Sequence, residues 1–232
     1  MTFNANPKLE FARKLLGKNY TKLLTIHNYC KMQEVFSDVS KDVLFVDKLL
    51  KDGNRARSII FKHIAESELK GEPIDYLEFG VHKGESFREW MGLSSNPQSR
   101  FFGFDTFEGL PEDWGPTPKG CFDVKGKLPE IPDGRGQFYA GLFQKTLPSF
   151  LATYEPKNRM VVHLDADLYT STLFTLTSLD RFFKPGTLIM FDEFSDCLHE
   201  FSAFYDYCRS FYRDWELLAS RVDLWKTVFR LK

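Results

Sequence analysis

The stretch Tyr76–Ser86, YLEFGVHKGES, decides the fold of this chain. Its first four residues form a short apolar run that predicts a β-strand, and the helical stretch Phe87–Met91 follows it directly. The loop between them contains Gly80 and Gly84, which leave the backbone open to close approach by a ligand. In open α/β sheets ligands bind at the carboxyl ends of the strands, so we expect this loop to form the floor of a ligand site.

The pattern of one strand and one helix continues along the rest of the chain. Further short apolar runs, separated by helical stretches, are Phe101–Phe104, Gln137–Ala140, Met160–Leu164 and Thr187–Phe191. This alternation predicts β-α-β units on a mostly parallel sheet. The C-terminal segment Trp215–Lys232 predicts two more strands joined by a short turn, forming a hairpin at one edge of the sheet.

The residues before this region have a different pattern. From residue 8 to about residue 70, apolar residues recur at helical spacing: Leu9, Leu15 and Leu16, then Leu23, Leu24 and Ile26, then Val43, Leu44, Val46, Leu49 and Leu50. A last helix with Ile59, Ile60 and Ile64 is expected to end before Gly71 and Pro73. We therefore expect an N-terminal helical extension over residues 1–72 and an α/β domain over residues 73–232.

Composition and charge restrict the class of protein. The 232 residues are 43% hydrophobic and 27% charged, as in an ordinary globular domain. The net charge is −1, and lysine and arginine are spread along the chain, which argues against a nucleic acid or membrane partner. The four cysteines have no CxxC spacing, so neither a disulfide framework nor a zinc site is indicated. No apolar run approaches the length of a membrane span, and the first residues lack a secretory signal, so we expect a cytoplasmic protein.

Two acidic residues near the glycine loop suggest which ligand binds there. Glu78 stands two residues before Gly80, where its carboxylate would repel a diphosphate but attract the α-ammonium group of a methionine. Asp105 ends the second strand, 21 residues beyond Gly84, in the position of an acceptor for ribose hydroxyls. A dinucleotide-binding loop would also require a third glycine. Glu78 and Asp105 thus favour S-adenosylmethionine over NAD, although the two acids could instead cap a turn and the following helix.

A second acidic group follows two other strands. The segment His163–Tyr169, HLDADLY, closes one apolar run, and Phe191–Phe194, FDEF, closes the next. If the strands are neighbours, Asp165, Asp192 and Glu193 converge and would repel one another unless a cation neutralised them. Such an all-oxygen ligand set suits Mg²⁺ or Mn²⁺. Alternatively, Asp192 and Glu193 start the next helix, where the helix dipole favours acids, and Asp167 and Tyr169 orient the loop.

Taken together, these segments resemble a known family. EFGVHKGES, FGFDTFEGLPEDW, AGLFQKTLP, HLDADLYTST and FKPGTLIMFDEF are similar to successive motifs of the macrocin O-methyltransferase family, over about residues 74–215. The resemblance implies a Rossmann-like class I methyltransferase fold, whose seven-stranded, mostly parallel sheet has an antiparallel last strand and helices on both faces. It also implies S-adenosylmethionine as donor and Mg²⁺ held by three acids. Characterised members methylate sugar or phenolic hydroxyls of natural products.

The resemblance assigns roles to individual residues. Asp165 and Asp192 match two metal ligands, and Glu193 stands where the best-known members have a second aspartate. The expected donor-binding residues are Glu78, Gly80, Val81, Gly84, Ser86, Asp105, Thr106, Gly141, Leu142 and Phe143, the last three near the adenine. Asp165 is the candidate base, whereas His163 is expected to be packed and His199 to be a surface residue.

The sequence therefore predicts an S-adenosylmethionine-dependent O-methyltransferase that acts on a small polar acceptor with the help of a divalent metal. The rival functions are an NAD-dependent oxidoreductase, which Glu78 and the missing third glycine oppose, and a non-catalytic S-adenosylmethionine-binding module. Residues 106–136, with glycines and prolines throughout, predict a long functional loop. We expect this loop and the N-terminal helices to form a lid over the acceptor. Alternatively, the helices extend the core or make a contact in a homo-oligomer.

Overall fold

The chain divides into two compact units, Met1–Asp38 and Val39–Lys232. The computed structural model describes residues 17–37, 39, 42–47, 53–131 and 133–232. In the first unit a 3₁₀ turn, Gly17–Asn19, leads into the helix α2, Tyr20–Val35. The helix predicted around Leu23, Leu24 and Ile26 is thus confirmed. Leu9, Leu15, Leu16, Leu49 and Leu50, which the same helical pattern included, lie outside the described residues.

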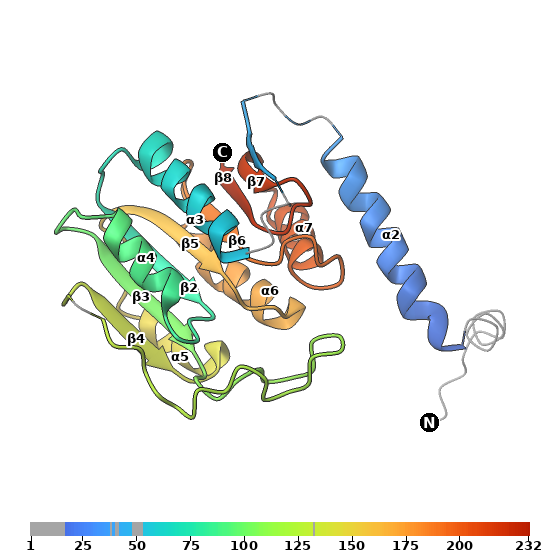
Figure 1. The fold of residues 1–232 in the computed structure, drawn as a ribbon, viewed down its shortest axis with the longest axis horizontal. Coiled ribbons are helices and arrows are strands. Elements are labelled where there is room, and N and C mark those ends of the chain that lie inside the picture. The colour runs from blue at the N-terminus through green and yellow to red at the C-terminus, as the bar shows by residue number, and fades with distance from the viewer. Residues whose placement is uncertain (1–16, 38, 40–41, 48–52, 132) are drawn as a thin grey trace. The chain divides into compact units, whose positions relative to one another are not determined.

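The second unit is built on one mixed sheet (Figure 1). Its strands are β1 (Leu44–Val46), β2 (Ile74–Phe79), β3 (Arg100–Asp105), β4 (Gly136–Ala140), β5 (Arg159–Leu164), β6 (Leu188–Phe191), β7 (Trp215–Arg221) and β8 (Thr227–Leu231). Their order across the sheet is β1-β7-β8-β6-β5-β2-β3-β4. Strand β8 runs antiparallel to both of its neighbours, and every other neighbouring pair is parallel. The predicted mostly parallel sheet with an antiparallel last strand is confirmed.

The sheet has eight strands, so the expected count of seven is wrong. The additional strand is β1, which comes from the segment predicted to be helical and pairs with β7 through Leu44 and Ala219. Periodicity does not separate a short apolar run in a helix from one in a strand, and here pairing with the open edge of β7 decides the conformation. The predicted hairpin β7–β8 forms but does not lie at the edge, because β8 inserts between β6 and β7 and β1 covers β7.

Helices cover both faces of the sheet (Figure 1). They are α3 (Gly53–Ile64) with the π-helical turn η2 (Ala65–Leu69), α4 (Glu85–Leu93), α5 (Phe143–Leu151), α6 (Tyr169–Leu179) with the 3₁₀ turn η3 (Asp180–Phe182), and α7 (Glu200–Phe211). Helices α3 and α4 pack together on one face, and α5, α6 and α7 form the other layer. The helix that continues through η2 ends at Leu69, just before Gly71 and Pro73, as predicted.

The central strands position the site. All six residues of β2 are buried, which is expected for a parallel strand covered by helices on both faces. The register pairs Phe79 with Phe104 on one side and with Leu164 on the other, and Leu164 with Phe191. The carboxyl ends of β2, β3, β5 and β6 therefore lie at one edge of the sheet, and the loops that follow them meet there.

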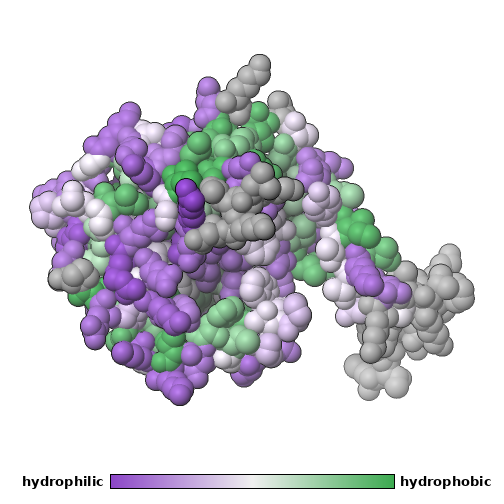
Figure 2. Space-filling model, in the orientation of Figure 1, coloured by the Kyte–Doolittle hydropathy of each residue, from purple (hydrophilic) through white to green (hydrophobic). Residues whose placement is uncertain are grey.

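The surface of the molecule is mixed in character. The face shown in Figure 2 is mainly hydrophilic, with separate smaller hydrophobic areas. Among the described residues, no helix has both the length and the apolar character needed to span a bilayer.

Candidate active site

A cavity of about 250 Å³ opens at the carboxyl edge of the sheet. Its walls come from the loops after β2, β3, β5 and β6 and from the start of α5. The lining residues are Gly80, His82, Asp105, Thr106, Gly109, Leu110, Pro111, Trp114, Phe122, Leu142, Phe143, Gln144, Asp165, Ala166, Asp167, Ser171 and Glu193. The predicted ligand-binding edge of the sheet thus contains a cavity, and residues from both acidic groups line it.

The glycines of the first loop are required by the protein itself. Gly80 has a φ of 92°, and a Cβ at this position would lie 1.7 Å from the carbonyl oxygen of Asp165. Gly84 has a φ of 73°, and its Cβ would lie 2.8 Å from the Cβ of Pro129. The absent side chain at Gly80 allows the loops after β2 and β5 to approach each other, which brings Asp165 to the floor of the cavity.

Asp105 holds two loops around the cavity. Its Oδ2 accepts hydrogen bonds from the backbone amides of Val81 and His82, each at 2.7 Å, and its Oδ1 accepts one from the amide of Phe107 at 2.7 Å. These contacts tie the glycine loop to the start of the loop after β3. Asp105 also lines the cavity, and a carboxylate has further lone pairs for ligand hydroxyls.

Glu78 lies behind the cavity wall. Its side chain is fully buried, and its two oxygens accept hydrogen bonds from the hydroxyls of Ser86 at 2.7 Å and Tyr76 at 2.5 Å. The Tyr76 hydroxyl also lies 3.0 Å from Nδ1 of His163. His163 is packed inside the domain, as expected, with its ring edge against Phe61. A polar network therefore runs beneath the cavity from the start of α4 to β5.

The charge of His163 in this network follows from the carboxylates around it. Burial by itself would lower the pKa of His163, but the carboxylates of Asp192 and Glu78, 3.9 and 3.7 Å from its ring nitrogens, outweigh burial and raise it to about 9. His163 is therefore a buried cation between two carboxylates at neutral pH. His199 also has a structural partner, because its Nδ1 accepts a hydrogen bond of 3.2 Å from the amide of Tyr169 at the start of α6.

The predicted donor-binding residues divide into two groups. Gly80, Asp105, Thr106, Leu142 and Phe143 line the cavity. The other five do not form its wall: Glu78, Val81, Gly84, Ser86 and Gly141. Two of them donate hydrogen bonds to the predicted acids, Val81 to Asp105 and Ser86 to Glu78.

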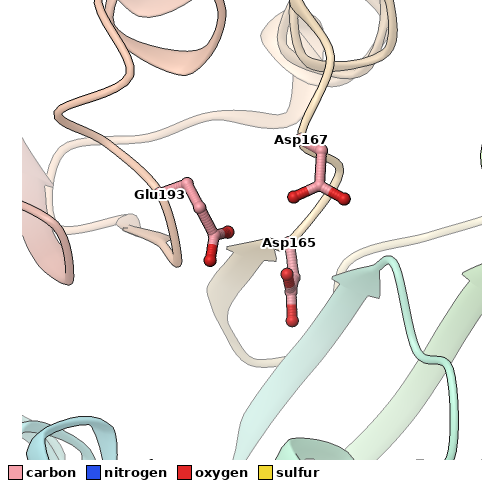
Figure 3. Close-up of side chains that lie close together, drawn as sticks. All are labelled: Asp165, Asp167 and Glu193. Atoms are coloured by element: carbon pink, nitrogen blue, oxygen red, sulfur yellow. The ribbon is translucent and has the colours of Figure 1, made fainter. Parts of the chain in front are cut away.

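Three carboxylates that line the cavity lie close together (Figure 3). One oxygen each of Asp165, Asp167 and Glu193 lies within 4.8 Å of the others. Asp165 follows β5, Asp167 stands two residues later with a φ of 57°, and Glu193 follows β6. A positive φ is unusual for a residue other than glycine, and it aims the Asp167 side chain back at Asp165 (Figure 3).

This carboxylate cluster has the properties of a site for a hard cation. Burial raises the pKa of Asp165 to about 7, and the negative charge of Asp192 adds to the effect. Burial and the charges of Asp165 and Asp192 likewise raise the pKa of Asp167 to about 8. The buried Oε2 of Glu193 has no hydrogen-bond partner among the described residues. Close carboxylates with an unpaired buried oxygen match the all-oxygen ligand sets of Mg²⁺ and Mn²⁺.

Asp192 has a different environment from the one predicted. It accepts a hydrogen bond from Nζ of Lys226, and its Oδ1 lies 3.6 Å from Nη1 of Arg57 and 3.9 Å from Nε2 of His163. Burial would raise the pKa of Asp192, but the nearby His163 and the charges of Lys226 and Arg57 lower it. Of the predicted metal ligands, Asp165 and Glu193 meet in the cluster, whereas Asp192 lies among cations and Asp167 completes the group.

Two sequence interpretations change accordingly. Asp192 and Glu193 do not start a helix, because the next helix, α7, begins at Glu200. The side chain of Glu200 instead accepts a hydrogen bond from the backbone amide of Glu193, at 3.0 Å from Oε2. The sequence pattern gives Asp167 only a role in orienting the loop, whereas the structure places its carboxylate with those of Asp165 and Glu193; its position two residues after Asp165 is the signal for this. Nothing in the sequence pattern indicates that Arg57 and Lys226 reach this site.

The long loop after β3 forms the apolar wall of the cavity. Leu110, Pro111, Trp114 and Phe122 all line it. Backbone hydrogen bonds order the loop, for example between the amide of Leu110 and the carbonyl of Cys121 at 2.9 Å. Nε1 of Trp114 donates to Oδ2 of Asp196 at 2.9 Å, so the loop is fastened to the segment after β6. A second bond of 2.5 Å joins Thr170 to Glu112.

Comparison with known proteins agrees with this arrangement. A family model described as a methyltransferase domain matches residues 77–194, which are 118 of the 232 residues. The chain belongs to this methyltransferase family. The matched region runs from β2 to the end of the FDEF segment and thus includes the glycine loop, Asp105 and the carboxylate cluster.

Individual relatives are more distant. The 8-demethyl-8-(2,3-dimethoxy-alpha-L-rhamnosyl)-tetracenomycin-C 4'-O-methyltransferase of Streptomyces olivaceus is 27% identical over an alignment 164 residues long, which covers 58% of this chain and 60% of that protein. The present chain therefore spans less than two thirds of the length of this relative.

Solved structures share the fold. The O-methyltransferase NovP has a TM-score of 0.59 and 22% identity, covering 75% of this chain and 79% of its own. The TDP-rhamnose 3'-O-methyltransferase CalS11, from calicheamicin biosynthesis, has a TM-score of 0.56 and 19% identity, covering 98% of this chain and 96% of its own. The predicted Rossmann-like methyltransferase fold is confirmed.

Proposed function

We propose that this methyltransferase transfers the methyl group of S-adenosylmethionine to a hydroxyl oxygen of a small polar acceptor, a sugar or a phenolic natural product, with a divalent cation, Mg²⁺ or Mn²⁺. One observation carries the proposal: Asp105 and the cluster of Asp165, Asp167 and Glu193 line the same cavity. A donor held by Asp105 and an acceptor held by the carboxylates would then share one enclosed space, which is what direct transfer requires.

The donor is expected on the side of the glycine loop. Asp105 would accept the ribose hydroxyls, and Thr106 lies beside it in the wall. Leu142 and Phe143, at the start of α5, offer an apolar surface for the adenine, next to Gly141. Glu78 would act from behind the wall: its bonds to Ser86 and Tyr76 fix the shape of the loop from Val81 to Gly84 and place negative charge near the methionine end.

The acceptor is expected between the carboxylate cluster and the loop after β3. A divalent cation on Asp165, Asp167 and Glu193 would supply the positive charge that lowers the pKa of an acceptor hydroxyl. Asp165 remains the expected base. Asp167 is a second candidate, because its carboxylate lines the same cavity beside Asp165. Trp114 and Phe122 would cover the apolar face of a sugar or aromatic ring and exclude water.

The relatives support a sugar as acceptor class. The curated relative is named for a 4'-hydroxyl on a rhamnosyl group, and CalS11 for the 3'-hydroxyl of TDP-rhamnose. An NAD-dependent oxidoreductase is not favoured, because the family match is to methyltransferases and a carboxylate stands behind a loop with only two glycines. A non-catalytic S-adenosylmethionine-binding module is the other outcome that the following test distinguishes.

The test combines binding with turnover. Calorimetry is expected to detect S-adenosylhomocysteine binding and no NADH binding. Methyl transfer to a panel of rhamnosylated and phenolic compounds should fall with EDTA and return with Mg²⁺ or Mn²⁺. Absence of S-adenosylhomocysteine binding at millimolar concentration would overturn the central proposal. Full activity in EDTA would remove the metal from it, and binding without turnover on any acceptor would favour the non-catalytic module.

A further inference from the structure

Lys226 is a buried lysine at the edge of the carboxylate cluster. Only 6% of its surface is exposed, and lysines are almost never buried to this extent unless they are paired. Its Nζ donates a hydrogen bond to Oδ2 of Asp192 and lies 3.5 Å from Oε1 of Glu193. These ion pairs raise the pKa of Lys226 although burial opposes the shift, so its ammonium group stays charged.

The backbone fixes this lysine in place. Lys226 ends the turn between β7 and β8, and its carbonyl accepts the amide of Arg221 at 2.8 Å. The preceding residue, Trp225, accepts the amide of Phe194 at 2.9 Å, which ties the turn to the segment that carries Asp192 and Glu193. The backbone of Lys226 is therefore fixed where the turn enters β8, and its buried side chain extends from there to Asp192 and Glu193.

The two carboxylates that Lys226 contacts have different surroundings. Asp192 is enclosed by cations, with Arg57 3.6 Å away in addition to Lys226. Glu193 contacts Lys226 with one oxygen, while its other oxygen has no hydrogen-bond partner among the described residues and the carboxylate points toward Asp165 and Asp167 (Figure 3). Lys226 therefore neutralises Asp192 and leaves part of Glu193 available to the cluster.

We propose that Lys226 is a positioning residue that acts as a built-in cation of this site: it removes Asp192 from the metal-ligand set and restricts a divalent cation to Asp165, Asp167 and Glu193. The inference rests on the proposed metal. The fixed positive charge of Lys226 repels a divalent cation bound nearby, and its ion pair with Asp192 occupies an oxygen that could otherwise bind that cation. The wild-type site is therefore weaker than one in which Asp192 is free to ligate.

The experiment measures Mn²⁺ binding to the full chain by calorimetry and by electron paramagnetic resonance, without acceptor. Lys226→Met is expected to bind Mn²⁺ about tenfold tighter than wild type, because a like charge is lost and a carboxylate is freed. Lys226→Arg, which keeps the charge, should bind as wild type does. Lys232→Met is the matched control, since Lys232 pairs with Glu216 at the same distance of 3.5 Å away from the cluster.

The outcomes are decisive in either direction. If folded Lys226→Met binds Mn²⁺ no tighter than wild type, the proposal is overturned. Should that variant fail to fold, Lys226→Gln, which keeps a polar group beside Asp192 but loses the charge, is measured in its place, and no tightening there overturns the proposal equally. S-adenosylhomocysteine affinity, measured on the same samples, tests the proposed function separately, because its loss in wild type would leave the Mn²⁺ comparison intact.

Discussion

Asp105 accepts hydrogen bonds from the backbone amides of Val81, His82 and Phe107, and it also faces the cavity. These two facts are connected, because three amides aimed at one carboxylate hold the glycine loop and the loop after β3 in the shape that leaves room for a ligand. The residue expected to bind the donor thus also shapes its site. Substitutions at this position should alter the site even before the ligand is considered.

Asp105→Asn is expected to weaken S-adenosylhomocysteine binding by about 1–3 kcal/mol, roughly fivefold to 150-fold. The variant loses the charge, and its amide group presents a donor where the carboxylate accepts backbone amides. Calorimetry measures the effect. The control is Asp133→Asn, because Asp133 accepts the amide of Arg135 at 2.9 Å but does not line the cavity. Wild-type affinity in Asp105→Asn would remove Asp105 from the proposed donor site.

At the scale of elements, the loop after β3 connects the two halves of the site. It begins beside Asp105, supplies the apolar wall, and is fastened by Trp114 to Asp196, beyond the carboxylate cluster. The side-chain hydrogen bonds of Trp114 and Glu112 join this loop to the rest of the domain, and many of its residues are exposed. These are the features of a segment that can open locally. We infer that it is the part of the predicted lid that belongs to the sheet domain.

Trp114→Phe is expected to open this loop without changing the fold. The substitution keeps an aromatic ring in the wall but removes the hydrogen bond to Asp196, which contributes about 1 kcal/mol, so opening should become about fivefold more frequent. Hydrogen exchange measured over residues 109–126 checks this expectation. Thr170→Val, which removes the bond to Glu112, should add to the effect. Unchanged exchange in the double variant would show that other contacts hold the loop.

At the scale of the whole molecule, the compact units divide at residues 38 and 39 and not near residue 72. Strand β1 and helix α3 are therefore parts of the sheet domain, and Arg57 of α3 reaches Asp192. A truncation that tests the N-terminal lid must spare them. Residues 1–38 can be removed without touching any strand of the sheet.

Deletion of residues 1–38 is expected to leave S-adenosylhomocysteine affinity unchanged and to lower turnover, if the N-terminal helix contributes to the lid. A second deletion, of residues 1–47, also removes β1 and leaves β7 as an open edge, so it is expected to aggregate. Calorimetry, turnover and light scattering distinguish the two. Unchanged kinetics after the shorter deletion would contradict the lid, and failure of that variant to fold would show that the helix extends the core.

Local sequence patterns predicted most of the fold. Apolar runs of four or five residues, separated by helical stretches, predicted β2, β5 and β6, because central parallel strands are buried on both faces and therefore almost uninterrupted in hydrophobicity. The same alternation located β3 and the edge strand β4, although these two strands are less buried. The acids that follow those runs could be located for the same reason: residues just beyond parallel strands gather at one edge of the sheet. Asp105, Asp165 and Glu193 line the cavity as this rule requires.

The tertiary structure decided the rest. Strand β1 exists because β7 offers an edge to pair with, and three residues are too few for periodicity to reveal it. Asp192 and Glu193 are neighbours in sequence, yet one is enclosed by cations and the other faces the cavity. The cations that cause this difference are distant in sequence: Lys226 lies 34 residues after Asp192, and Arg57 lies 135 residues before it. Long-range pairing of charges depends on how strands and helices are assembled, and no local pattern encodes it.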